Sequence, residues 1–201
     1  MPKLTQVRKS AYHITEPLLP LLAKRHITPT ALTWTGFAVS LGASALIATG
    51  HLFPAGFVVL VSGFFDMLDG ALARHANQTT HSGAVLDSTL DRVSEAVMLL
   101  AVLVFYLTST SQSTIGILVT GLALAGSPLV SYIRARAETI GLECKKGLFT
   151  RAERVIVLVV GLLASQLDYA LVIALAIIAL FSFITAGQRL RYVLKQTEKS
   201  S

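Results

Sequence analysis

Long apolar stretches separated by short polar segments dominate the chain from residue 29 onwards. Six of these stretches have a length suited to crossing a membrane: 29–50, 53–75, 82–108, 113–138, 150–167 and 169–192. A transmembrane helix needs about 20 apolar residues to cross a hydrocarbon core about 30 Å thick. The pattern therefore predicts an all-α integral membrane protein with six transmembrane helices.

Residues 1–28 follow a different pattern. Between Leu4 and Leu22, apolar residues recur at spacings of three and four, and lysines and arginines surround them. This spacing places the apolar side chains on one face, which is typical of a helix lying in the membrane interface. We therefore expect an N-terminal amphipathic juxtamembrane segment over 1–28, a six-helix domain over 29–192 and a short tail over 193–201.

Two helix starts are marked by their residues. Thr28 followed by Pro29 is typical of an N-cap and the first helical position. Thr150 and Glu153 have the spacing of a capping box at the start of the fifth span.

Composition supports a membrane protein. Hydrophobic residues make up 53% of the chain and charged residues only 14%, against about 25% charged residues in soluble domains. The single cysteine, Cys144, excludes an intramolecular disulfide.

The distribution of basic residues predicts the orientation. Lysine and arginine are absent from the segments 49–53, 108–113 and 165–168, which face outward if the N-terminus is cytoplasmic. By the positive-inside rule, both termini then lie at the cytoplasmic side of the cell (inner) membrane. The net charge of +6 is thus a topology signal and an attraction to anionic lipid, not a sign of nucleic-acid binding.

Four aspartates occur within 26 residues of otherwise apolar sequence: Asp66, Asp69, Asp87 and Asp91. Ionised carboxylates at membrane depth are costly unless they are paired or bind a metal ion. Two lie near the cytoplasmic end of the second span and two near that end of the third, so antiparallel packing would bring them together. All-oxygen ligation suits Mg²⁺ or Mn²⁺, and a pair of such ions typically clamps phosphate groups.

Small and basic residues accompany the aspartates. Gly70, Ala73 and Gly83 remove bulk where a ligand must approach closely, and Arg74 provides a planar donor for phosphate. Together these residues predict a membrane-embedded site for a diphosphate and metal ions. The alternative is an ion or metal transporter, because intramembrane aspartates also mark ion pathways.

The run DMLDGALAR, followed eight residues later by GAVLDSTLD, resembles the signature of the CDP-alcohol phosphotransferase family at all eight positions. The resemblance implies six transmembrane helices, a homodimer and a requirement for Mg²⁺ or Mn²⁺, with two ions in each active site. It also implies transfer of a phosphatidyl-type group from a CDP-linked lipid, CDP-diacylglycerol, to a hydroxyl acceptor, with release of CMP.

The resemblance also implies roles for individual residues. Asp66, Asp69 and Asp87 are expected to bind the metal ions. Asp91 is expected to bind the second ion and to act as the general base on the acceptor hydroxyl. The donor is expected to contact five further residues: Thr33, Gly70, Ala73, Arg74 and Gly83.

Arginines at the inner ends of the later spans bear on the acceptor. Arg134, Arg154 and Arg189 lie beside small or polar residues, and guanidinium groups bind phosphate in a bidentate manner. The stretches SYIRARAE and GLFTRAERVIVL are similar to the phosphatidylinositol-phosphate synthase branch of the family, whose acceptor is inositol 1-phosphate. The resemblance implies that five residues bind its phosphate: Ser131, Arg134, Arg136, Arg154 and Arg189.

Some assignments stay open at this point. An archaetidylinositol-phosphate synthase would use a different lipid donor, and a phosphatidylglycerophosphate synthase would use glycerol 3-phosphate as the acceptor. The role of Glu95, four residues after Asp91, is also open. It can hydrogen-bond within the site, form a structural ion pair or contact a second subunit.

Overall fold

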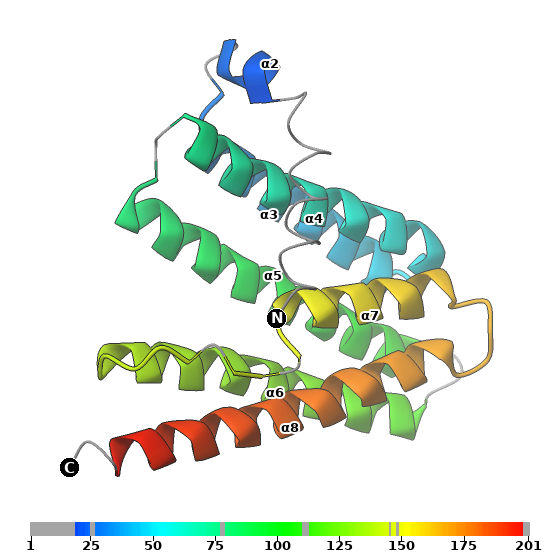
Figure 1. The fold of residues 1–201 in the computed structure, drawn as a ribbon. Coiled ribbons are helices and arrows are strands. Elements are labelled where there is room, and N and C mark those ends of the chain that lie inside the picture. Colours follow the sequence, from blue (N-terminus) through cyan, green and yellow to red (C-terminus); the bar gives the residue numbers. More distant parts are fainter. Residues whose placement is uncertain are drawn as a thin grey trace. The chain divides into compact units, whose positions relative to one another are not determined.

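The computed structural model describes residues 19–24, 27–76, 79–109, 113–144, 146–147 and 149–198. All regular structure in these residues is helical, as predicted (Figure 1). The helices are α2 (Leu19–Lys24), α3 (Pro29–Ala48), α4 (Leu52–His75), α5 (His81–Thr108), α6 (Thr114–Thr139), α7 (Arg151–Leu163) and α8 (Ala170–Thr197). The expected N-terminal amphipathic helix lies outside the described residues, apart from the stretch that forms α2.

Within the described part of the chain, four helices are long and apolar enough to cross a membrane: α3, α4, α6 and α8. Helix α5 matches the predicted third span and has 28 residues, but its first half carries several charged side chains.

Helix α7 is shorter than the span predicted for it over 150–167. It has 13 residues, which at about 1.5 Å per residue gives about 20 Å, less than the thickness of the hydrocarbon core. The predicted end is wrong because the helix stops at Leu163, before the polar residues Ser165 and Gln166. The turn that follows contains Tyr169 in a left-handed conformation, with φ 63°.

Two helix starts have the caps that their sequences predict. The Ala31 backbone N–H donates to Thr28 Oγ1 at 3.2 Å, and Pro29 is the first residue of α3. The Glu153 carboxylate accepts from the Thr150 backbone N–H at 2.8 Å, which is the returning bond of a capping box. These bonds satisfy amides that the start of a helix leaves unpaired.

The chain forms two compact units. Unit 1 comprises the described residues up to Ala43 together with Val58–Ser94, and unit 2 comprises Ser44–Phe57 together with the described residues from Glu95 onwards. Helices α3, α4 and α5 each contribute residues to both units. The four motif aspartates belong to unit 1, and the five expected acceptor residues belong to unit 2.

In unit 1, the short helix α2 packs against α3 and α4. The buried residues of this core are Leu19, Leu32, Leu68, Ala71 and Leu72, and Leu22, Ile27, Phe64 and Phe65 pack against them. Serines tie the helices together at two further points. Ser62 Oγ donates to the Gly36 carbonyl oxygen at 2.9 Å, and Ser40 Oγ lies 3.0 Å from Ser94 Oγ. These contacts hold α3 against α4 and α5 beside the aspartate motif.

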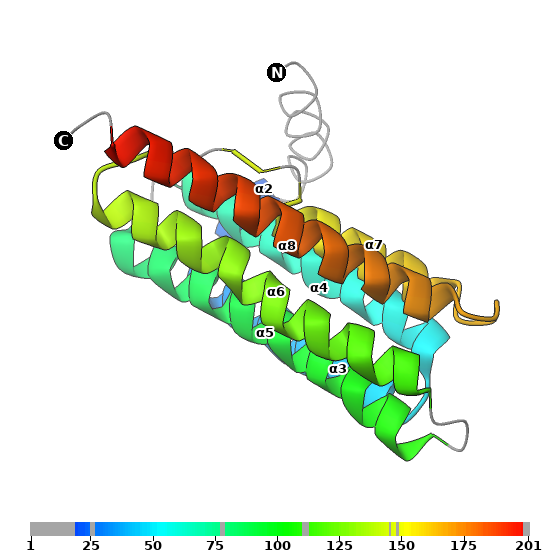
Figure 2. The ribbon, with the colours of Figure 1, turned by 90° about the horizontal axis from the view of Figure 1, so that it is seen from below.

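In unit 2, α8 packs along α6 and also contacts α7 (Figure 2). The core of this unit is largely aliphatic, with buried residues such as Ala123, Val130, Leu158, Leu162, Leu175 and Ile178. Two arginines, Arg154 and Arg189, are buried in the same unit. Buried charges in an aliphatic core need partners.

Gly36 leaves little room for a side chain. A Cβ atom there would lie 3.0 Å from Phe65 Cβ and 3.1 Å from Asp66 Oδ1, whereas a Cβ at Gly42 of the same helix would meet nothing within 4 Å. We expect Gly36→Ala to destabilise the protein by about 1–3 kcal/mol, as overpacking does. Gly42→Ala should be neutral or slightly stabilising. Thermal unfolding in detergent measures the difference, and equal midpoints would contradict the close contact of α3 with α4.

Candidate functional site

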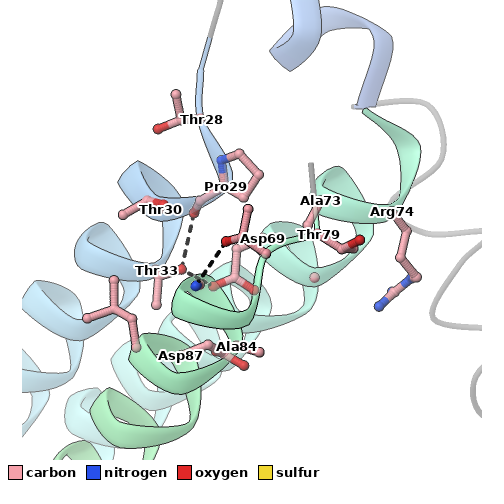
Figure 3. Close-up of a pocket in the computed structure, with 14 residues that line it drawn as sticks. Thr28, Pro29, Thr30, Thr33, Asp69, Ala73, Arg74, Thr79, Ala84 and Asp87 are labelled. Atoms are coloured by element: carbon pink, nitrogen blue, oxygen red, sulfur yellow. Dashed lines mark hydrogen bonds between the residues drawn. The ribbon is translucent and has the colours of Figure 1, made fainter. Parts of the chain in front are cut away.

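A cavity of about 500 Å³ opens in unit 1, beside the start of α3, the end of α4 and the start of α5 (Figure 3). Seven of the expected site residues line it: Thr33, Asp69, Gly70, Ala73, Arg74, Gly83 and Asp87. They include all five residues that are expected to contact the donor. A volume of this size is typical of a small-molecule binding site.

Asp69 is buried in the cavity wall and is held by Thr33. Thr33 Oγ1 lies 2.6 Å from Asp69 Oδ2 and 3.1 Å from the Pro29 carbonyl oxygen (Figure 3). The hydroxyl has one proton, and the shorter contact to the charged carboxylate is the stronger of the two. Only 4% of Asp69 is exposed, so this bond compensates a carboxylate that water hardly reaches. It also joins α3 to α4 at the site.

Two further carboxylates act on Asp69. Asp66 and Asp87 both lie close enough to repel its charge. Asp91 follows Asp87 by one helical turn on α5 and is partly buried. The structure thus brings three of the four expected metal ligands into one electrostatic cluster, with contributions from α4 and α5.

Within the described residues, the aspartates do not form a complete set of metal ligands. Among the residues that the structure describes, no group of three or more His, Cys, Asp or Glu side chains is arranged to hold an ion. One oxygen of Asp69 is engaged with Thr33. The chemistry of the set still fits a hard divalent cation, because every donor is a carboxylate oxygen and their repulsion is relieved by positive charge.

Arg74 is exposed at the cavity and lies over Gly70. Its Nη1 atom is 3.4 Å from the position that a Cβ atom of residue 70 would take. The glycine therefore leaves room for the guanidinium. This arrangement suits the expected role of Arg74 in binding a diphosphate.

Threonines outside the aspartate motif also line the cavity. They are Thr28, Thr30, Thr79 and Thr80. Thr80 caps α5, because its Oγ1 accepts from the Gly83 backbone N–H at 3.0 Å. A threonine three residues before Gly83 is an N-cap pattern that could have indicated this position. Thr79 carries no comparable signal.

In unit 2, Arg154 of α7 and Glu95 of α5 form a buried ion pair. Arg154 Nε lies 2.5 Å from Glu95 Oε1, and Nη2 lies 2.7 Å from Oε2. The two side chains are only 2% and 8% exposed. Of the roles open to Glu95, the structure therefore shows the ion pair.

Arg189 of α8 is the second buried arginine. Its Nε donates to the Lys146 carbonyl oxygen at 2.8 Å, and its Nη1 donates to the Val130 carbonyl oxygen at 2.6 Å. Both of these acceptors are neutral. The charges of Arg134 and Arg154 lie close enough to repel that of Arg189. We call these three residues the arginine cluster.

The remaining expected acceptor residues lie on α6. Arg134 Nε pairs with Glu138 Oε1 at 2.9 Å, and both side chains are more than half exposed. Ser131 is partly buried and Arg136 is exposed. Among the five expected acceptor residues, Arg154 and Arg189 are therefore the ones that the core holds in place.

Known proteins resemble this chain over most of its length. The family model for CDP-alcohol phosphatidyltransferases matches residues 26–186. An archaetidylinositol phosphate synthase from Methanothermobacter thermautotrophicus is 36% identical, and the match covers 94% of this chain and 93% of that protein. A phosphatidylinositol phosphate synthase from Mycobacteroides abscessus is 37% identical, over 92% of this chain and 86% of that protein.

A solved structure shows the same fold. The phosphatidylinositol phosphate synthase of Mycobacterium tuberculosis, crystallised with CDP-DAG bound, matches with a TM-score of 0.83 and 34% identity, over 90% of this chain and 94% of that one. A second structure of that enzyme, in complex with manganese and citrate, also gives a TM-score of 0.83. The helical fold and the site thus define a phospholipid-synthesising transferase. The chain belongs to the CDP-alcohol phosphatidyltransferase family.

A double-mutant cycle tests the bond between Thr33 and Asp69. Thr33→Val and Asp69→Asn each remove one partner, and we expect a coupling free energy of about 1–3 kcal/mol, as for a hydrogen bond to a charged group. Thr35→Val is the matched control, since Thr35 Oγ1 donates to the Ala31 carbonyl oxygen of its own helix. Unfolding free energies in detergent measure the coupling. Simple additivity of the two changes would argue against the bond.

Proposed function

We propose that the protein transfers the phosphatidyl group of CDP-diacylglycerol to the hydroxyl group of inositol 1-phosphate, with phosphatidylinositol phosphate and CMP as products. The observation that carries this proposal is the unit 1 cavity, which contains all five expected donor contacts together with Asp69 and Asp87. Family membership supports a CDP-linked donor. The names of the relatives support an inositol phosphate acceptor.

The cavity suits a nucleotide diphosphate. Gly70 and Ala73 follow one another along one face of α4 and leave space for the cytidine group. Arg74 supplies a guanidinium that matches the geometry of a phosphate. The start of α5, at Gly83, adds the positive end of a helix dipole, which favours an anion.

Asp66, Asp69, Asp87 and Asp91 would hold two divalent ions, Mg²⁺ or Mn²⁺. Carboxylate oxygens are the ligands that such ions prefer. When bound, the ions would offset the negative charge of the donor diphosphate and of the departing CMP. The relative that was crystallised with manganese supports this part of the proposal.

Asp91 is the proposed general base. Its carboxylate takes the proton of the acceptor hydroxyl as that oxygen forms a bond to the phosphorus that carries the lipid. The bond between this phosphorus and the bridging oxygen of the diphosphate breaks, and CMP leaves with the electron pair. Arg74 stabilises the negative charge that develops on the leaving phosphate.

The acceptor phosphate is proposed to bind Ser131, Arg134, Arg136, Arg154 and Arg189. Inositol 1-phosphate and glycerol 3-phosphate both carry a phosphate monoester, so arginines favour either of them over a neutral alcohol. Relatives named for inositol phosphate lipids favour inositol 1-phosphate. Because one of these is an archaetidylinositol phosphate synthase, a CDP-linked archaeal lipid is the second candidate donor.

We further propose that α5 and α7 complete a set of six membrane helices in each subunit, and that the protein is a homodimer. The distribution of basic residues supports a position of both termini and of the unit 1 cavity at the cytoplasmic face of the cell membrane. The distribution of charge along α5 supports its inclusion, since the stretch after Glu95 is apolar.

Activity assays of the purified protein identify both the class of reaction and the acceptor. We expect CMP release from CDP-diacylglycerol in the presence of Mg²⁺ or Mn²⁺ with inositol 1-phosphate, and much less with glycerol 3-phosphate or free inositol. Mass spectrometry of the lipid product identifies the transfer. Ion flux into sealed vesicles without any CMP release would instead support a transporter.

Asp91→Asn tests the general base. Removing a positioned base typically slows a reaction by about 10²–10⁴-fold, and we expect kcat to fall within this range while the protein stays folded. Asp168→Asn, at an exposed position between α7 and α8, is the matched control and should keep normal turnover. Near-normal kcat in Asp91→Asn would exclude Asp91 as the base.

A further inference from the structure

The pairing of Glu95 with Arg154 uses only one edge of the guanidinium. Glu95 accepts from Nε and Nη2, whereas the third nitrogen, Nη1, is buried and has no hydrogen-bond partner among the residues that the structure describes. Two of the five N–H donors of an arginine sit on this nitrogen. A buried charged donor without an acceptor is unfavourable. Arg154 is therefore held firmly on one side and lacks an acceptor on the other.

Arg189 is also oriented by the protein itself. The Lys146 and Val130 carbonyl oxygens hold its Nε and Nη1. Gly147, next to Lys146, has a φ of 131°, and a Cβ atom there would lie 3.0 Å from Arg189 Nε. The glycine thus permits the backbone to approach the guanidinium closely. Contacts within unit 2 therefore fix the orientation of both buried guanidinium groups.

The charges of the arginine cluster do not cancel. Glu95 balances Arg154 and Glu138 balances Arg134, whereas the two carbonyl partners of Arg189 are neutral. Arg134 and Arg154 repel the charge of Arg189, and Glu138 attracts it. An anion with several acceptor oxygens, such as a phosphate monoester, meets both requirements: it balances the excess charge and accepts from Nη1 of Arg154.

We propose that Glu95 is a positioning residue for the acceptor phosphate. It fixes the Arg154 guanidinium by its Nε and Nη2 edge, so that Nη1 is left to donate to the phosphate. Glu95 itself does not touch the substrate in this arrangement. The inference rests on the proposed function, in which the arginine cluster binds the phosphate of the acceptor.

The ion pair can balance charge or can position Arg154, and the two roles predict different effects on KM. Glu95→Asp separates the two roles, because it keeps the negative charge and shortens the side chain by one methylene. Positioning predicts a rise of about 10-fold in the KM for inositol 1-phosphate, the usual effect of losing a hydrogen bond to a charged group. The KM for CDP-diacylglycerol should stay unchanged. Charge balance alone predicts that neither KM moves.

A double variant at Glu95 and Arg154 provides a second test of the positioning role. In an Arg154→Gln background, Glu95→Gln should raise the acceptor KM no further, because Glu95 acts only through Arg154. This double variant is uncharged at both positions, so it avoids an isolated buried charge. Glu198→Gln, exposed beyond the end of α8, is the control for removing an acidic group. An additional rise in the acceptor KM in the double variant would overturn the positioning role.

Stabilisation by inorganic phosphate tests the role of Glu95 independently of the proposed function. Phosphate should raise the thermal unfolding midpoint of the wild-type protein relative to chloride at equal ionic strength, and Glu95→Asp should lose most of that rise. If this holds but inositol 1-phosphate is not a substrate, the proposed function fails and the role of Glu95 stands. Equal phosphate stabilisation in the two proteins would contradict the positioning role.

Discussion

Charged side chains inside apolar helices need partners, and this requirement organises both units of the protein. An ionised group without a partner in such surroundings costs several kcal/mol. In unit 1, Thr33 provides one hydrogen bond to Asp69, but the repulsion from Asp66 and Asp87 remains. In unit 2, Glu95 pairs with Arg154, whereas Arg189 donates to two neutral carbonyl oxygens. We therefore expect unit 1 to bind a cation and unit 2 to bind an anion. The proposed CDP-lipid donor with its metal ions and the proposed phosphorylated acceptor match these expectations.

One face of α3 supports the proposed donor site. Thr33, Gly36 and Ser40 recur at spacings of three and four, so they lie along the same side of the helix. Thr33 bonds to Asp69, Gly36 accepts from Ser62, and Ser40 meets Ser94. Small side chains allow helices to approach closely, and hydroxyl groups then bond across the contact. The aspartates are thus held by helix packing as well as by their own hydrogen bonds.

Local features were the most predictable from the sequence. The caps at Thr28 and Thr150 depend on neighbouring residues, and both occur as expected. The spacing of the aspartate motif on two helices joined by a short connection predicted that its members converge, and two of the four, Asp69 and Asp87, line one cavity. The family assignment is also confirmed.

Features that depend on tertiary packing could not be predicted. The pairing of Glu95 with Arg154 joins residues 59 positions apart, and three roles for Glu95 were equally compatible with its sequence position. The hydrogen bond from Thr33 to Asp69 is likewise non-local. The early end of α7 at Leu163 was missed because the predicted span was continued through the polar residues Ser165 and Gln166 to Leu167.

Manganese binding tests most directly whether the unit 1 carboxylates require a cation. Electron paramagnetic resonance of purified protein titrated with Mn²⁺, with and without CDP, reports the bound ion without any turnover. We expect wild-type protein to bind Mn²⁺ more tightly when CDP is present, Asp69→Asn and Asp87→Asn to lose this binding, and Asp168→Asn to keep it. Equal Mn²⁺ affinity in all four proteins would show that these carboxylates do not require a cation.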